Sequence, residues 1–232
     1  YLAPIWSRAA IVFDHLAIAQ SGHRFRNLPR EKQQALLSRW SRDPALSSLL
    51  GAFSFPIKLV HFDRNAFAYV MDRATGEVLV AEPFAPMNWS TGVDLKTGRP
   101  SVNPAKATKQ DVLVTDICPS LEGGKNQQPA AFSPATGLFY VPTVNLCMDY
   151  KGRAVQYYAG TPYIGADAPE KGGPGGYKGE FIAWDAAAGK KVWGIKEPFP
   201  VWGGALATKG GVVFYGTLDG WFKAVDASSG KV

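Results

Sequence analysis

Three side chains in the sequence have types that could contact a ligand through hydrogen bonds or a flat apolar surface. Arg64 lies in residues 61–65 (HFDRN), and its planar guanidinium can donate to two adjacent oxygens, a geometry that lysine does not reproduce. Asn126 follows Gly-Gly-Lys, and Trp202 precedes two glycines that allow close backbone approach. Each residue also has an ordinary alternative: a surface arginine in a hairpin turn, a loop asparagine, and a tryptophan of the core.

Other residue types with chemical potential are few. The two cysteines, Cys118 and Cys147, fit one disulfide in an oxidising compartment, and two free thiols are the alternative. The three histidines lack the spacing of metal ligands. The glycine-rich residues 172–176 lack the strand-to-helix context of a nucleotide-binding loop.

The composition is that of a globular protein, with 46% hydrophobic and 19% charged residues. The 25 glycines, 17 prolines and 12% aromatic residues favour short strands and tight turns, as in a sandwich, barrel or propeller. The net charge of +6 is scattered rather than gathered into a basic stripe. We therefore expect no nucleic-acid partner, and interpret the charge as favouring solubility or attraction to an acidic protein. No apolar run is long enough for a transmembrane helix.

The elements that must position these residues change in type near residue 55. From residue 1 to about 55, apolar residues recur at helical spacing with punctuation at Pro29 and Pro44, which predicts a segment of two or three short helices whose role is unknown. Residues 56–232 alternate strand-like runs with glycine-containing turns and are expected to form an all-β domain. The Gly- and Pro-rich residues 166–179 are expected to form a long loop.

A repeated phrase lies within the second domain. Residues 183–193 read AWDAAAGKKVW, residues 224–232 read AVDASSGKV, and residues 69–79 (YVMDRATGEVL) are a weaker copy. The first two copies are about 40 residues apart, which is typical of propeller blades. The aspartate can accept hydrogen bonds from the turn, and the glycine supplies a positive φ. One copy would be a common β-turn, but the repetition favours blades, with three tryptophans expected to pack between them: Trp184, Trp193 and Trp221.

Further segments are distinctive in combination: residues 61–65 (HFDRN), 116–120 (DICPS), 123–134 (GGKNQQPAAFSP), 145–150 (NLCMDY), 179–184 (GEFIAW), 200–204 (PVWGG) and 214–220 (FYGTLDG). Together with the repeat, which is similar to a tryptophan-docking motif, they resemble the PQQ-dependent alcohol dehydrogenases of the methanol dehydrogenase type. PQQ is pyrroloquinoline quinone. Residues 123–134 are most similar to the lanthanide-dependent members. The resemblance runs from about Ile57 to Val232 and leaves the first 55 residues unmatched.

The resemblance implies a fold and an activity. The fold is a partial eight-bladed β-propeller of roughly three to four blades, preceded by the short helical segment. The activity is PQQ-dependent oxidation of methanol or another primary alcohol in the periplasm, with electrons passed to a cytochrome c. The full-length parent is expected to be a homodimer.

The resemblance also assigns roles to residues. Arg64 is implied as the catalytic residue that donates to the quinone oxygens, and Asn126 and Trp202 as further contacts of PQQ. Cys118 and Cys147 match a disulfide of the family, which would close a loop of about 30 residues and stabilise the fold by about 3–4 kcal/mol.

We expect the chain to be a fragment from the C-terminal half of such an enzyme. In the family, the catalytic base and the ligands of the metal, a lanthanide or Ca²⁺, lie upstream of the matched region, so no metal ligand is expected here and the fragment should be inactive alone. A non-catalytic propeller scaffold of the outer-membrane assembly type is the alternative, and the combination of Arg64, Asn126 and Trp202 argues against it.

Overall fold

The computed structural model describes residues 58–160 and 165–232, together with residues 28, 29, 32, 35, 36 and 39. The chain divides into two compact units, Tyr1–Pro56 and Ile57–Val232. In the first unit, four of the described residues have helical backbone: Lys32, Ala35, Leu36 and Arg39. The rest of the predicted helical segment lies outside the described residues.

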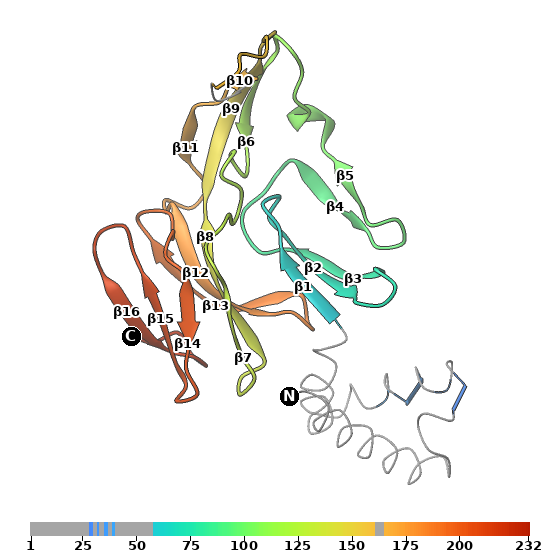
Figure 1. The fold of residues 1–232 in the computed structure, drawn as a ribbon, viewed down its shortest axis with the longest axis vertical. Helices are drawn as coiled ribbons and strands as arrows, with labels where there is room; N and C mark the ends of the chain where they lie inside the picture. The colour runs from blue at the N-terminus through green and yellow to red at the C-terminus, as the bar shows by residue number, and fades with distance from the viewer. Residues whose placement is uncertain (1–27, 30–31, 33–34, 37–38, 40–57, 161–164) are drawn as a thin grey trace. The chain divides into compact units, whose positions relative to one another are not determined.

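The second unit is built from antiparallel sheets that follow one another along the chain (Figure 1). The order of strands is β1-β2-β3 in the first sheet, β13-β12-β8-β7 in the second and β14-β15-β16 in the third. The strands are β1 (Lys58–Phe62), β2 (Phe67–Asp72), β3 (Val78–Pro83), β7 (Ala131–Ser133), β8 (Leu138–Val144), β12 (Gly179–Asp185), β13 (Lys190–Glu197), β14 (Ala205–Ala207), β15 (Val212–Gly216) and β16 (Phe222–Asp226).

Two smaller sheets are formed by segments that precede β7 and by segments inserted between β8 and β12. One is the hairpin of β4 (Ser90–Asp94) and β5 (Arg99–Val102), which is followed by a 3₁₀ helix, η3 (Pro104–Lys106). The other is centred on β9 (Leu146–Gly152), which continues β8 after one residue and pairs with β6 (Leu113–Ile117), β10 (Ala166–Asp167) and β11 (Glu170–Gly172). The expectation of a long loop at 166–179 is therefore wrong in part, because β10 and β11 occupy its first half.

Each repeat folds as the sequence predicts. Asp185 Oδ1 accepts hydrogen bonds from the backbone N–H groups of Ala187 and Ala188, at 2.9 and 3.0 Å. Asp226 Oδ1 accepts from Ser228 and Ser229 in the same way, at 3.1 and 2.8 Å. The carboxylate thus satisfies the donors of the turn, and the glycine four residues later takes the left-handed φ that closes it.

The core lies between sheets rather than within one sheet. One cluster joins the first sheet to the second through Val70, Ile182 and Trp184, and another joins the second sheet to the third through Phe181 and Tyr215. The rings of Phe181 and Tyr215 stack with centroids 3.9 Å apart. Face-to-face packing of successive sheets is how a propeller buries apolar side chains that a lone blade would expose.

The repeat also supplies the contact that joins the second sheet to the third. The ring of Trp193 covers Gly230, where an added Cβ would lie 2.7 Å from the ring, and its Nε1 donates to the Ala227 carbonyl at 3.2 Å. At the preceding junction, Val80 stands at the position of Trp193 and covers Gly189 in the same way. Valine fills less space and cannot donate, so the two junctions differ in strength.

The predicted packing roles of the tryptophans are confirmed for two of the three. Trp184 is buried, and Trp193 lies against the next repeat. The prediction for Trp221 is wrong, because its side chain is 66% exposed just before β16. A tryptophan at the start of a strand does not occupy the docking position of the repeat.

A buried ion pair adds a polar contact to the same junction. Glu197 at the end of β13 is 3% exposed, and its carboxylate accepts from Lys223 Nζ at 2.7 Å and from the Tyr215 hydroxyl at 2.7 Å. Burial and the neighbouring carboxylate both raise the pKa of Tyr215, so the phenol stays a donor. The pair and the tyrosine bond therefore join the end of β13 in the second sheet to β15 and β16 in the third sheet.

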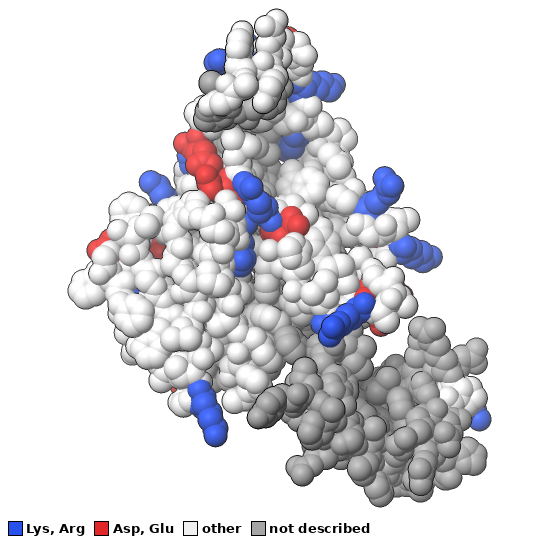
Figure 2. Space-filling model, in the orientation of Figure 1, with Lys and Arg blue, Asp and Glu red and all other residues white. Residues whose placement is uncertain are grey.

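Charge is dispersed over the surface. On the face shown in Figure 2, the lysine and arginine side chains lie at separate points and form no continuous strip. Within the described residues, no helix has the length and apolar character needed to cross a lipid bilayer.

The junction through Trp193 gives a stability prediction. Trp193→Val should lower the free energy of unfolding by about 2–4 kcal/mol, because it removes buried ring area and the bond to Ala227. Trp221→Val makes the same change at an exposed site and should shift it by less than about 0.5 kcal/mol. Urea titration followed by circular dichroism measures both, and equal losses in the two variants would contradict the docking role of Trp193.

The turn at Asp226 gives a prediction about pH. Hydrogen bonds from Ser228 and Ser229 lower the pKa of Asp226 from 3.8 to about 2. A carboxylate whose pKa is lower in the folded state stabilises the fold above the unfolded pKa, and that contribution is lost as pH falls from about 4 to about 2. The double variant Ser228→Ala, Ser229→Ala should therefore lose less stability over this range than the parent chain. Ser101→Ala, at an exposed strand position, should not change the slope of unfolding free energy against pH.

Candidate functional site

Arg64 lies in a tightly bonded turn between β1 and β2. The Asp63 carboxylate accepts from the Asn65 backbone N–H at 2.8 Å, and Asn65 Oδ1 accepts from the Phe67 N–H at 2.9 Å. Trp89 Nε1 donates to the Asn65 carbonyl at 2.9 Å. Ala66 closes the turn with φ +75°, which a non-glycine residue adopts at some cost. These bonds fix the backbone of Arg64 while leaving its side chain exposed.

The segment that follows β6, residues 121–129, packs with its backbone directly against the backbone of this turn. The N–H of Gly124 donates to the Arg64 carbonyl at 2.9 Å, and the Arg64 guanidinium donates to the Leu121 carbonyl. A Cβ on Gly123 would lie 2.5 Å from the Arg64 carbonyl oxygen and 2.8 Å from its Cα. Gly123 also has φ +78°. Both the contact and the conformation therefore require glycine.

Asn126 lies further along the same segment. Its backbone N–H donates to Gln128 Oε1 at 3.0 Å, and its side-chain amide donates to Glu122 Oε2 at 3.2 Å. Gln128 is 1% exposed. The amide of Gln128 in turn donates to the Val201 carbonyl at 3.3 Å, which links the segment to the residue before Trp202. Pro129 contacts the chain just after Trp202: Ala205 N–H donates to Pro129 O at 2.9 Å, and a Cβ on Gly204 would lie 2.6 Å from the proline ring.

Residues 121–129 therefore connect all three residues that the sequence singled out. The segment bonds to the turn of Arg64 at one end, carries Asn126 in its middle, and reaches the segment of Trp202 at the other end. The structure gives no direct contact between the three side chains. It brings their backbones together, and their roles in binding PQQ remain predictions.

The sequence analysis missed two residues of this neighbourhood. Gln128 is the buried link described above, and Lys125 lies between Gly124 and Asn126. The Lys125 side chain is partly buried, and burial lowers the pKa of its ammonium below the ordinary 10.5. Among the described residues, no carboxylate oxygen lies within 4.0 Å of the charged nitrogens of Arg64 or Lys125. The only signal in the sequence for Gln128 and Lys125 was their place in the segment 123–129 (GGKNQQP).

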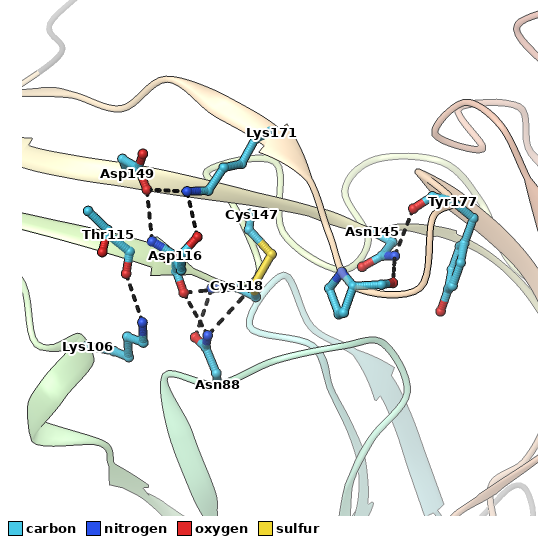
Figure 3. Close-up of a disulfide and its surroundings, with 11 residues drawn as sticks. Asn88, Lys106, Thr115, Asp116, Cys118, Asn145, Cys147, Asp149, Lys171 and Tyr177 are labelled. Atoms are coloured by element: carbon cyan, nitrogen blue, oxygen red, sulfur yellow. Dashed lines mark hydrogen bonds and ion pairs between the residues drawn. A yellow bond between two sulfur atoms is a disulfide. The ribbon is translucent and has the colours of Figure 1, made fainter.

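The predicted disulfide is confirmed (Figure 3). Cys118, just after β6, is bonded to Cys147 on β9, across a sequence separation of 29 residues. Asn88 holds the same region, because its Oδ1 accepts from the Cys118 N–H and its Nδ2 donates to the Asp116 carbonyl. Lys171 bridges the carboxylates of Asp116 and Asp149, at 2.6 and 2.7 Å. The disulfide thus fixes the start of the segment that carries Asn126.

A groove on the described surface lies elsewhere. It has a volume of about 550 Å³ and is lined by the chain after β3 and by β12 and β13, including Met87, Glu180, Trp184 and Lys191. None of Arg64, Asn126 and Trp202 lines it. The indole Nε1 of Trp184 is buried without a hydrogen-bond partner. In the part of the chain that the structure describes, no group of three or more His, Cys, Asp and Glu side chains could hold a metal ion.

Sheets in chain order, stacked face to face and joined by aspartate turns with a docking tryptophan, define part of a β-propeller. The predicted all-β propeller class is confirmed for the described residues. A solved europium-containing methanol dehydrogenase matches with a TM-score of 0.73 and 54% identity, covering 75% of this chain and 31% of that chain.

Sequence comparison gives the family. The chain is 55% identical over 177 residues to a lanthanide-dependent methanol dehydrogenase of Methylacidiphilum fumariolicum, covering 75% of this chain and 29% of the relative. It is 39% identical over 181 residues to methanol dehydrogenase (cytochrome c) subunit 1 of Methylobacterium organophilum, with 75% and 29% coverage. No protein-family model matches. The matched three quarters of the chain belong to the quinoprotein alcohol dehydrogenases, and the chain spans somewhat less than a third of these relatives.

The backbone contact at Gly123 gives a test of the site's architecture. Gly123→Ala should lower the free energy of unfolding by about 3–5 kcal/mol, because the methyl group adds overpacking against Arg64 to the cost of a left-handed φ. Gly137→Ala has a similar φ of +71° with no atom within 4 Å of the added methyl, and should cost only about 1–2 kcal/mol. Chemical denaturation compares the two, and equal losses would show that the close approach is not a constraint.

Proposed function

We propose that the chain contributes one wall of a PQQ site in a quinoprotein that oxidises methanol or another primary alcohol. The observation that carries the proposal is the set of backbone bonds between residues 121–129 and the turn of Arg64. It holds two cations, Arg64 and Lys125, on the same segments as the Asn126 amide, and neither cation has a carboxylate within 4.0 Å among the described residues. A polyanionic quinone supplies the charge that such a site lacks.

The residues present fit this cofactor. PQQ has two adjacent quinone oxygens and three carboxylates, and when bound it accepts a hydride equivalent from the alcohol carbon. The Arg64 guanidinium can donate to both quinone oxygens, where negative charge develops during reduction. The side-chain amide of Asn126 can donate to a further oxygen. The indole of Trp202 offers a flat apolar surface, and the glycines that follow it allow Gly216 and Pro129 to approach the chain closely.

The remainder of the site is proposed from the relatives. The lanthanide dependence in the name of the Methylacidiphilum protein favours a lanthanide over Ca²⁺ as the metal of this protein. We propose a cytochrome c as the electron acceptor, because it appears in the name of the Methylobacterium relative. The disulfide favours an oxidising compartment such as the periplasm.

Equilibrium dialysis of PQQ against the chain tests the cofactor assignment. The chain should bind PQQ saturably, and Arg64→Lys should weaken binding about tenfold because the two-pronged donation is lost. Arg99→Lys makes the same change at an exposed position of β5 and should bind as the parent does. Absence of saturable binding in the parent chain would overturn the assignment and favour a non-catalytic propeller scaffold.

An assay of dye reduction with methanol, PQQ and a lanthanide tests whether the catalytic base and the metal ligands lie outside this chain's matched residues. We expect no turnover, because the catalytic base and metal ligands implied by the family lie outside the matched residues. Turnover comparable to that of a complete enzyme would show that the described residues contain those groups.

A further inference from the structure

The backbone of Lys125 is fixed by contacts of the residues before and after it, Gly124 and Asn126. Gly124 donates to the Arg64 carbonyl at 2.9 Å and accepts from the Val144 N–H at 2.9 Å. A Cβ on Gly124 would lie 3.0 Å from the methyl groups of Ala66 and Ala85, so the backbone has little freedom there. On the other side, Asn126 bonds to the buried Gln128. The start of the Lys125 side chain is therefore fixed beside the turn of Arg64.

The ammonium group of Lys125 is partly buried and has no anionic partner among the described residues. It donates to the Asn126 carbonyl at 3.1 Å. An ammonium has three donors, so two remain for other acceptors. Burial lowers the pKa of the group, and no carboxylate or phenolate contributes to that shift. A partly buried cation is costly unless an anion accompanies it.

The buried charges elsewhere in the described chain have such partners. Glu180 is 5% exposed and pairs with Lys191 at 2.7 Å, and Glu197 is 3% exposed and pairs with Lys223 at 2.7 Å. Glu122 is the carboxylate of the same segment as Lys125, and its bond goes to the Asn126 amide instead. The charge on Lys125 is thus available to a ligand.

We propose that Lys125 is a cofactor-binding residue whose ammonium pairs with a carboxylate of PQQ, beside the contacts of Arg64 and Asn126. This inference rests on the proposed function. It assigns the guanidinium to the quinone oxygens and the ammonium, a point charge on a flexible stem, to a carboxylate. The two cations then recognise different parts of one planar anion and fix its orientation along the segment 121–126.

The test compares PQQ binding by the 232-residue chain with binding by three variants, using equilibrium dialysis. Lys125→Met should weaken binding about tenfold, and Lys125→Arg, which keeps the charge, should restore most of it. Lys96→Met changes an exposed lysine of the β4–β5 turn and should bind as the parent does. Unaltered binding by Lys125→Met would overturn the inference and leave the proposed function standing, whereas failure of the parent to bind would overturn both.

A cofactor analogue separates pairing from packing. The trimethyl ester of PQQ keeps the quinone but has no carboxylate charge. Esterification should weaken binding to the parent chain about tenfold more than it weakens binding to Lys125→Met. In the absence of cofactor, Lys125→Met should unfold at the same or a higher urea concentration, because an unpaired charge is removed. Equal ester effects in both proteins, or a marked loss of stability without cofactor, would assign Lys125 a structural role and overturn the inference.

Discussion

The contact between Gly123 and the backbone of Arg64 is the constraint on which the rest of the site depends. The two segments approach so closely that no side chain fits between them, and the Gly124 N–H then bonds the Arg64 carbonyl. Ordering two loops costs conformational entropy, and loops that belong to different sheets usually make few contacts that offset this cost. Backbone bonds and glycine replace those contacts, so the side chains of Arg64, Lys125 and Asn126 are left to meet a ligand.

The supports of this contact come from distant parts of the chain. The disulfide fixes the start of residues 118–129, Gln128 and Pro129 fix their end against the chain before β14, and the turn of Arg64 is fixed by Trp89. Each support is itself held by a sheet, and the sheets are held by the docking of one repeat on the next. A site assembled from loops is precise only if the scaffold beneath it is rigid. The stacked sheets supply that rigidity through apolar layers on both faces of the central sheet.

Local chemistry explains which parts of this arrangement could be predicted from the sequence. The aspartate turns could be predicted because the carboxylate bonds to donors only two and three residues away. Long-range partners could not be predicted in this way. Trp193 occupies the last position of the repeat and docks on Gly230, whereas Trp221 lies outside the repeat and is exposed, although both tryptophans were expected to pack. Likewise β10 and β11 lie in a stretch rich in glycine and proline, and they form strands because β9 offers them a partner. Gln128 was missed for the same reason, since its acceptor, the carbonyl of Val201, is distant in sequence.

The two sheet junctions show how the same repeat can be used with different strength. Trp193 docks on Gly230 with a hydrogen bond and is joined by the Glu197–Lys223 pair, whereas Val80 docks on Gly189 without a donor. The weaker docking falls between the sheet that carries the turn of Arg64 and the sheet that follows Asn126. Residues 121–126 cross this junction by backbone bonds and so reinforce it where the repeat is weakest. A ligand that contacted both Arg64, which follows β1, and Lys125, which precedes β7, would bridge the same junction. Binding at this site would therefore raise the free energy of unfolding of the stacked sheets.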